Sequence, residues 1–307
     1  MSKTLGARKK MSEETYTPNT VLIATLDVLG ITQLMQRGKP EALNVIASKI
    51  KSAFENAMTG TNRAIKEIFG ETKAPDALQK IILDHIFNPA VKFHDFSDTI
   101  VISCDISHVD ADAVKKALKK GEDMDAGVKL AVNTAVILFG VQVLYSYNAL
   151  LREGFPVRGC VDAGAVYLSE KLVVGRPYVN SLHIGEALDF FGIVITNDAL
   201  DFCKKHEEDG MGVSVFDVID LYVPLKSRDG RIEYSLQKCL NWLVPGDPYA
   251  SKQFNENQDW RQFLYEKFAA NGKSMTESAL RKLANTENTV RAFIMHNKEA
   301  KKTKKDK

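Results

Sequence analysis

The sequence predicts a mixed α/β (α+β) fold, and three observations support this class. Short apolar, β-rich segments such as TVLIATLDVLG (20–30) are separated by stretches with helical spacing of apolar residues, as in 39–69. Hydrophobic residues make up 45% and charged residues 26% of the 307 residues, as in ordinary globular proteins. After about residue 240, prolines and polar residues replace the strand-like segments. We therefore expect one α/β domain over 18–240 and a mainly helical extension over 241–297.

The elements follow one another along the chain in a recognisable order. After the first strand, the helical stretch 39–69 has an expected break at Thr59-Gly60. The later elements are two strands bent at Phe96–Asp98, a strand pair over 155–169, a strand passing into a helix over 171–191, and a hairpin over 212–237 whose turn is Ser227–Gly230. Ser274 and Glu277 fit a capping box, which predicts the start of a C-terminal helix.

Charge and cysteine usage limit the classes of function. The net charge is only +2, and basic residues gather at the two ends, so we expect disordered tails over 1–17 and 298–307 and no nucleic-acid partner. The start of the chain is polar and has no apolar signal-peptide core. No zinc-ligand spacing occurs among the four cysteines, which are Cys104, Cys160, Cys203 and Cys239. These features predict a reduced, cytoplasmic protein.

One segment could contradict that localisation. The segment from Leu130 to Leu151 contains no charged residue and is long enough to span a bilayer. Its polar residues Asn133, Gln142 and Asn148 are spread around the helix, which hydrocarbon disfavours. A crossing would also put the preceding and following strands on opposite sides of a membrane. We expect a helix buried inside the protein or by a second subunit, with a membrane tether as the alternative.

Several common catalytic motifs do not occur. The chain has no GxGxxG, HExxH or GxSxG sequence. Gly159 and Gly164 have Walker-like spacing, but Ala165-Val166 follow where Lys and Ser or Thr are required. These observations argue against dehydrogenase, zincin, α/β-hydrolase and P-loop functions.

Two carboxylates associated with strands remain as candidates for chemistry. Asp27 ends the first strand, where Gly30 would let the backbone turn and Thr32 would cap a helix whose start suits a phosphate. Asp98 would add a second carboxylate if its hairpin lies beside that strand. Two such carboxylates suit two-metal phosphoryl transfer. The alternatives are a capping role for Asp27 and an ordinary hairpin turn at Asp98.

These motifs, in this order, resemble the class III nucleotide cyclases over 20–237. LDVLGITQL is similar to their first strand and turn, and FSDTIVIS to their metal hairpin, with Ser97 in place of a glycine. PVRGCVDAGAV is similar to a strand that carries an arginine, and VVGRPYVNSLHIGEAL to a segment whose asparagine orients the ribose. The resemblance implies a class III cyclase-like fold, with a ferredoxin/palm-type sheet flanked by helices and a helical C-terminal extension.

The departures from this family concern the transition state and the base. Ile184 stands where the family has an arginine, for which His183, Arg176 or Arg158 could substitute. His94 and Val173 stand where adenylate cyclases read the purine with a lysine and an aspartate. A site without such hydrogen-bonding side chains loses its discrimination between bases. This combination resembles the Pycsar anti-phage cyclases, which make cyclic pyrimidine nucleotides; a buried histidine in the sheet is the alternative for His94.

The resemblance implies a homodimeric pyrimidine cyclase, with uridylate preferred over cytidylate, that converts UTP (or CTP) to the cyclic monophosphate and pyrophosphate, with active sites at the dimer interface. Two Mg²⁺ or Mn²⁺ ions would be held by Asp27, Val28 and Asp98. The nucleotide would be bound by Gly30, Thr32, His94 and Val173. Catalysis would involve Asn180, Lys226, Arg158 and Arg176, with Asn180 coming from the opposite subunit. A separate effector would sense the product, and no membrane partner is expected.

Two alternatives to this function stay open. The first is a purine cyclase with an unusual base pocket. The second is a degenerate cyclase-fold domain that binds a nucleotide or a partner without turnover, which Ile184 favours and the two aspartates disfavour.

Overall fold

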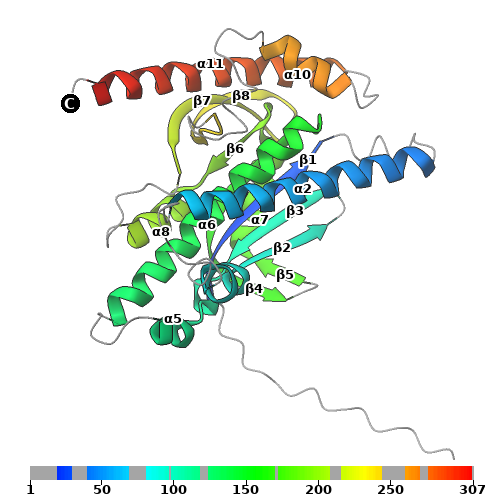
Figure 1. The fold of residues 1–307 in the computed structure, drawn as a ribbon. Helices are drawn as coiled ribbons and strands as arrows, with labels where there is room; N and C mark the ends of the chain where they lie inside the picture. Colours follow the sequence, from blue (N-terminus) through cyan, green and yellow to red (C-terminus); the bar gives the residue numbers. More distant parts are fainter. Residues whose placement is uncertain are drawn as a thin grey trace, which may run out of the picture.

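The computed structural model describes residues 19–29, 40–68, 81–96, 98–117, 124–169, 172–207, 216–243, 260–269 and 276–305. These residues form an eight-stranded sheet with helices on both faces (Figure 1). The predicted mixed α/β class, with a sheet flanked by helices, is therefore confirmed.

The strands run in the order β2-β3-β1-β4-β6-β8-β7, and β5 pairs with β4. Their bounds are β1 (Asn19–Val28), β2 (Val91–Phe96), β3 (Thr99–Cys104), β4 (Val157–Ser169), β5 (Leu172–Gly175), β6 (Gly192–Ile195), β7 (Val218–Lys226) and β8 (Ile232–Leu240). Neighbours are antiparallel except β4 and β6. The order β2-β3-β1-β4 is that of a split βαβ, ferredoxin-like sheet.

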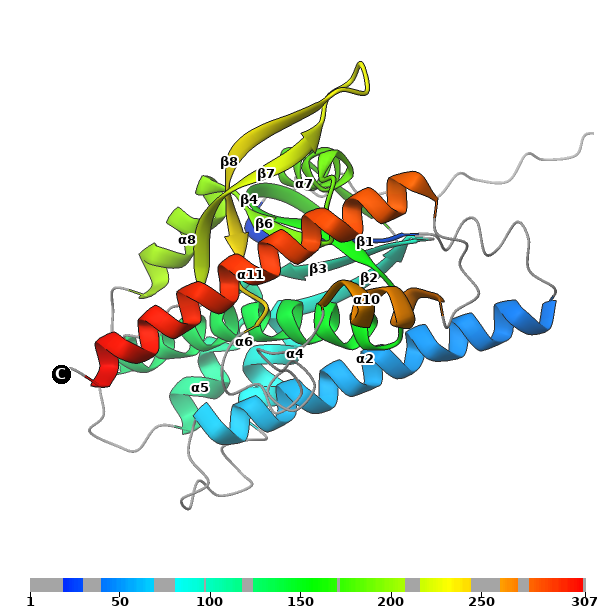
Figure 2. The same cartoon turned by 90° about the horizontal axis from the view of Figure 1, so that it is seen from above.

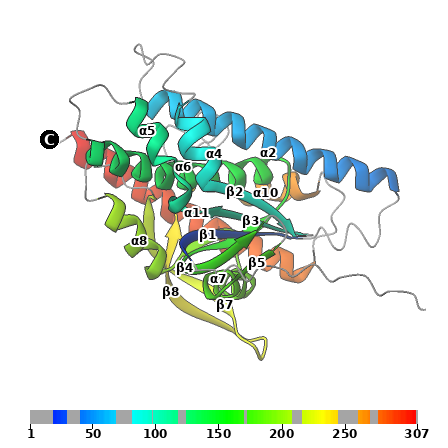
Figure 3. The same cartoon turned by 90° about the horizontal axis from the view of Figure 1, so that it is seen from below.

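The long helices cover the sheet in two layers. The helices are α2 (Pro40–Ile68), α4 (Asn88–Ala90), α5 (Ala111–Ala117), α6 (Met124–Arg152), α7 (Arg176–Ala187), α8 (Asn197–Glu207), α10 (Trp260–Ala269) and α11 (Glu277–Lys305). Short π-helical and 3₁₀ turns span Ile82–Phe87 and Ile106–His108. Helices α2 and α6 lie on one face of the sheet and α7 on the other (Figure 3).

Helix α6 contains the uncharged segment 130–151, expected to be a buried helix, with a membrane tether as the alternative. In the described chain it is the one helix long and apolar enough to cross a membrane, with a most apolar stretch of mean hydropathy 1.7 that is 61% buried inside the protein. Two of its buried polar side chains are hydrogen-bonded to other parts of the chain: Gln142 Oε1 accepts from Thr61 Oγ1 over 2.5 Å, and Asn148 Nδ2 donates to the Trp242 carbonyl over 3.3 Å. Because the sheet and α2 of the same chain bury α6, its composition gives no separate reason to expect a second subunit.

The expected break at Thr59-Gly60 is wrong, because α2 runs through both residues. Gly60 instead allows close packing on α6: a Cβ placed there would lie 3.1 Å from the Tyr145 ring. A glycine inside a helical pattern therefore marks a helix contact here and not a helix end.

The expected strand pair over 155–169 is also wrong, because β4 is a single strand that covers most of this stretch. At Gly164 the φ of +152° favours glycine, and a Cβ there would lie 2.8 Å from Pro177 of α7. The strand β6 and the helix α8 were not anticipated from the sequence.

The C-terminal helices pack into the same hydrophobic core as the sheet. Their buried residues include Leu264, Phe268, Leu283, Val290 and Phe293. Helix α11 crosses beside β7 and β8 (Figure 2) and extends to Lys305, through most of the segment expected to be a disordered tail. Lysines at the end of a helix complement its dipole, which suits this extension.

The cap of α11 differs from the predicted one. Thr276 Oγ1 accepts a bond from the Ala279 amide over 3.2 Å, so Thr276 caps the helix. The predicted cap Ser274 and the N-terminal segment 1–17 lie outside the described residues.

Candidate active site

A pocket of about 320 Å³ lies where β1, the β2–β3 hairpin, β4 and α7 meet. It is lined by Thr25, Asp27, Val28, Leu29, Asp98, Thr99, Arg158, Leu182, Gly185 and Glu186. Most of the polar side chains in this lining are charged. This concentration of charged side chains in a pocket at the end of β1 makes it the candidate site.

The strand register brings the two candidate aspartates together. In the β1–β3 pairing Asp27 lies opposite Thr99, so Asp98 is one residue from the paired position. The Val28 amide donates to the Asp98 carbonyl over 2.8 Å, which fixes the end of β1 against the hairpin. Both aspartates thus line one pocket, although they are far apart in the sequence.

Arg158 is the one basic side chain among the described residues that line this pocket. It lies opposite Asp27 in the β1–β4 register, and its Nε donates to Asp27 Oδ2 over 2.8 Å. Its Nη1 donates to the carbonyl oxygens of Glu186, over 2.5 Å, and Leu188, over 3.4 Å. The guanidinium therefore bridges a carboxylate on the sheet and the carbonyl end of α7, where a helix dipole favours positive charge.

The pocket holds more negative than positive charge. The pKa of Asp27 is raised, chiefly because burial disfavours the carboxylate; Arg158 opposes this shift, while the charges of Asp98 and Glu186 add to it. One guanidinium thus faces three acidic side chains. A further cation bound here would relieve their repulsion.

The ligand types fit a divalent ion of the magnesium class. Mg²⁺ prefers carboxylate oxygens, and Asp27 and Asp98 supply them. Arg158 bonds only one oxygen of Asp27. In the described part of the chain no group of three or more His, Cys, Asp or Glu residues is arranged to hold a metal. A metal here would need its remaining ligands from water or from a bound phosphate.

Three of the predicted catalytic residues lie away from this pocket in their own chain. Asn180, in α7, donates from Nδ2 to the buried Asp162 over 2.8 Å. Arg176 begins α7 and is exposed. Lys226 ends β7 and is also exposed, on the hairpin that projects from the sheet (Figure 2). Of the four predicted catalytic residues, only Arg158 lines the pocket.

The two predicted base readers are buried beside the same valine. His94 pairs with Val101 across β2 and β3, and Val173 packs in a small apolar cluster that also contains Val101. Neither lines the pocket. Gly30 and Thr32, the other predicted nucleotide-binding residues, lie outside the described residues, as does Ser97.

The sequence interpretation did not identify two polar residues near the site. Glu186 lines the pocket, but its position follows only from the placement of α7 on β4. Asp162 accepts bonds from Asn180 and from Thr196 Oγ1, the latter over 2.6 Å. The alternation of side chains along a strand could have found Asp162, because it shares a strand face with Arg158.

Comparison with known proteins gives little similarity. No family model and no curated protein matches the chain. Among solved structures, one match is the structure of a bacterial light-regulated adenylyl cyclase, which is 10% identical and covers 83% of this chain and 100% of that chain, with a TM-score of 0.28. Similarity this low establishes neither function nor family.

Proposed function

We propose that this chain is a metal-dependent nucleotide cyclase that acts on a pyrimidine nucleoside triphosphate, UTP or CTP. The observation that carries the proposal is the pocket in which Asp27 and Asp98 meet beside Arg158. Phosphoryl transfer from a triphosphate needs positioned positive charge, and a pocket rich in carboxylates recruits it as divalent ions.

Asp27 and Asp98, with the backbone of Val28 beside them, would hold two Mg²⁺ or Mn²⁺ ions. Such ions would neutralise the triphosphate and lower the pKa of the ribose 3′-hydroxyl. Arg158 has a positioning role, because its bonds to Asp27 and to the end of α7 fix the carboxylate in the pocket. The 3′-hydroxyl would lose its proton to water and form a bond to the α-phosphorus, the bond from that phosphorus to the β-phosphate oxygen would break, and pyrophosphate would leave.

A homodimer with sites at the interface is part of the proposal. Asn180 and Lys226 do not line the pocket of their own chain, so a second subunit would have to supply them. Exposed apolar side chains lie on two surfaces suited to such contact: Tyr222, Tyr234 and Leu236 on the β7–β8 hairpin, and Leu172, Val174 and Val179 on β5 and α7. Tyr222, Leu236 and Tyr234 share a hairpin face with Lys226.

The pyrimidine preference rests on what the resemblance implies for Val173 and His94, neither of which lines the pocket of its own chain. Val173 is 5% exposed in an apolar cluster and cannot accept a bond from an adenine amino group. His94 could present a donor or an acceptor to a uracil edge. In the resembling family the product acts as a signal in anti-phage defence, so we propose a cytoplasmic enzyme whose product a separate effector senses.

A nucleotide-binding module without turnover is the second candidate. Two observations favour it: Ile184 replaces the arginine of the resembling family, and the ion pair between Asp27 and Arg158 already satisfies one metal-ligand candidate. This candidate predicts binding of a nucleotide without release of pyrophosphate.

Product analysis tests both candidates. The purified chain is incubated with ATP, GTP, CTP or UTP plus Mn²⁺, and products are identified by mass spectrometry. We expect a cyclic pyrimidine nucleotide that disappears in Asp98→Asn and persists in Asp201→Asn, a control at an exposed carboxylate of α8. A cyclic purine would contradict the pyrimidine preference alone. No product, with Mn²⁺-dependent nucleotide binding in calorimetry, would favour the binding module.

A further inference from the structure

A buried carboxylate immediately after α7 ties the C-terminal helix to the rest of the protein. Asp189 has a side chain only 1% exposed. Arg281 of α11 donates to it from Nε over 2.6 Å and from a terminal nitrogen over 3.0 Å. Lys282 Nζ lies 3.6 Å away, and Asn285 Nδ2 donates over 3.2 Å. A carboxylate this buried needs such partners, because an unpaired buried charge is costly.

The same stretch of α11 also binds backbone atoms. Asn285 Nδ2 donates to the Asp189 carbonyl over 2.8 Å, and the Phe191 amide donates to Thr286 Oγ1 over 2.8 Å. These bonds are directional, unlike the apolar contacts of Leu283 and Phe293 on the same helix. The apolar contacts attach α11, whereas the polar contacts fix the position of residues 189–191.

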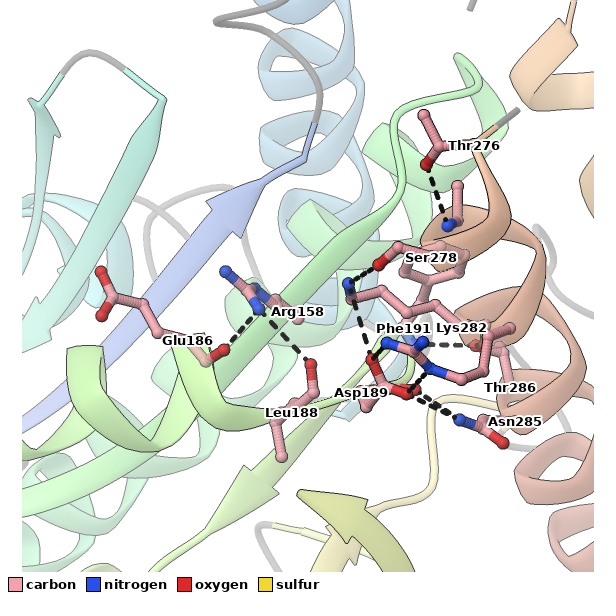
Figure 4. A network of polar contacts seen from close by, with 12 residues as sticks. Arg158, Glu186, Leu188, Asp189, Phe191, Thr276, Ser278, Lys282, Asn285 and Thr286 are labelled. Atoms are coloured by element: carbon pink, nitrogen blue, oxygen red, sulfur yellow. Dashed lines mark hydrogen bonds and ion pairs between the residues drawn. The ribbon is translucent and has the colours of Figure 1, made fainter. Parts of the chain in front are cut away.

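The other side of this segment faces the active-site pocket. Arg158 donates to the carbonyl oxygens of Glu186 and Leu188, and the latter residue precedes Asp189 in the chain. Figure 4 shows Leu188 and Asp189 between Arg158 on one side and Lys282 and Asn285 on the other. The short connection from α7 to β6 is thus held from the pocket by one arginine and from the C-terminus by α11.

We propose that α11 is a positioning element of the pocket: through residues 186–191, Arg281 and Asn285 hold Arg158 in place on Asp27. If the α11 contacts are lost, the carbonyl oxygens that Arg158 bonds become free to move, and the guanidinium loses one of its two anchors. The C-terminal extension then belongs to the site, although none of its described residues lines the pocket. The expected effect on turnover rests on the proposed cyclase function; the coupling to Arg158 does not.

The test observes Arg158 directly, by NMR of its Nε–H group in isotope-labelled full-length protein, with the signal assigned by its loss in Arg158→Lys. In Arg281→Ala we expect exchange of this hydrogen with water to be about tenfold faster, which corresponds to about 1.4 kcal/mol of lost protection. Arg291→Ala is the matched control, because Arg291 lies on the same helix and pairs only locally, with Glu287 over 2.7 Å. We expect less than about a twofold change in that variant.

Asn285→Ala provides a second variant that keeps the ion pair of Asp189, in case Arg281→Ala does not fold. Unchanged exchange at Arg158 in folded Arg281→Ala and Asn285→Ala would overturn the inference. An equal change in Arg291→Ala would overturn it as well, because it would indicate general loosening of the protein.

Turnover separates this inference from the cyclase proposal. If the wild type forms a cyclic nucleotide, we expect kcat in Arg281→Ala to fall about three- to tenfold, the range typical of changes transmitted between packed elements. If the wild type forms no product, only the cyclase proposal fails, and the exchange measurement still decides whether α11 positions Arg158.

Discussion

Helices α6 and α11 have the same length, 29 residues, but different chemistry attaches them to the sheet. Helix α6 is buried over almost its whole second half, and apolar side chains such as Phe139, Leu150 and Leu151 lie in the hydrophobic core that it shares with the sheet. Helix α11 buries an apolar stripe and is otherwise polar, and its directed bonds form two groups. One group runs from Arg281 to Thr286 and bonds residues 189–191. The other consists of His296 and Asn297, which bond Asp217, Asn241 and Leu243.

The two kinds of contact contribute differently: apolar burial stabilises the fold, whereas directed bonds set the positions of atoms. Apolar burial stabilises in proportion to the area removed from water and has little directional preference. Hydrogen bonds and ion pairs contribute less net free energy, but they fix the positions of particular atoms. Helix α6 therefore supports the sheet as a whole, whereas the polar stretch Arg281–Thr286 of α11 fixes one segment beside the pocket.

The largest expected effect is a loss of stability from the α6 side. Phe139 is fully buried and packs edge to face on Phe216 with ring centroids 6.4 Å apart. Phe139→Ala is expected to lower the free energy of unfolding by about 3–5 kcal/mol, because it removes buried area and leaves a cavity. Urea denaturation followed by circular dichroism measures the change. A loss below about 1 kcal/mol would contradict the assignment of α6 as the main stabilising helix.

A smaller loss of stability is expected from α11. Arg281→Ala removes two charge-assisted bonds from Asp189 but leaves Lys282 and Asn285 in contact, and the Arg281 side chain is already 44% exposed. We expect a loss of about 1–2 kcal/mol in the same denaturation experiment. A loss as large as that of Phe139→Ala would mean that α11 supports the whole fold and would remove the contrast between the helices.

The sequence was sufficient to predict the features that depend on local pattern. The apolar, β-rich run before Asp27 and the bend expected at Phe96–Asp98 predict strands with carboxylates at their ends, and the structure brings Asp27 and Asp98 into one pocket. The uncharged stretch 130–151 predicts a buried helix for the same reason. Their proposed role in metal binding stays a prediction.

Features that depend on contacts between residues far apart in the chain could not be predicted from a single sequence. Arg158 and Asp27 are 131 positions apart and meet only through the β1–β4 register. Asp189 and Arg281 are 92 positions apart, and neither belongs to a motif. Gly60 has the same sequence signature in a helix break as in a close helix contact, and only packing against Tyr145 distinguishes the two.

The smallest expected effect concerns a buried thiol: we expect Arg281→Ala to leave Cys104 protected from labelling by the folded α6 side of the core. Cys104 lies under α6, where its Sγ is 3.8 Å from the Ala135 carbonyl, and burial raises the pKa of this thiol far above its ordinary value. Because the thiolate is the reactive form, labelling at pH 8 requires the α6 side of the core to open. If α11 acts locally, Arg281→Ala exposes Arg158 to exchange but leaves Cys104 labelling limited by global unfolding. Thiol labelling followed by mass spectrometry of the Cys104 peptide measures this. Labelling faster than the drop in global stability allows would show that loosening of α11 spreads through the sheet to α6.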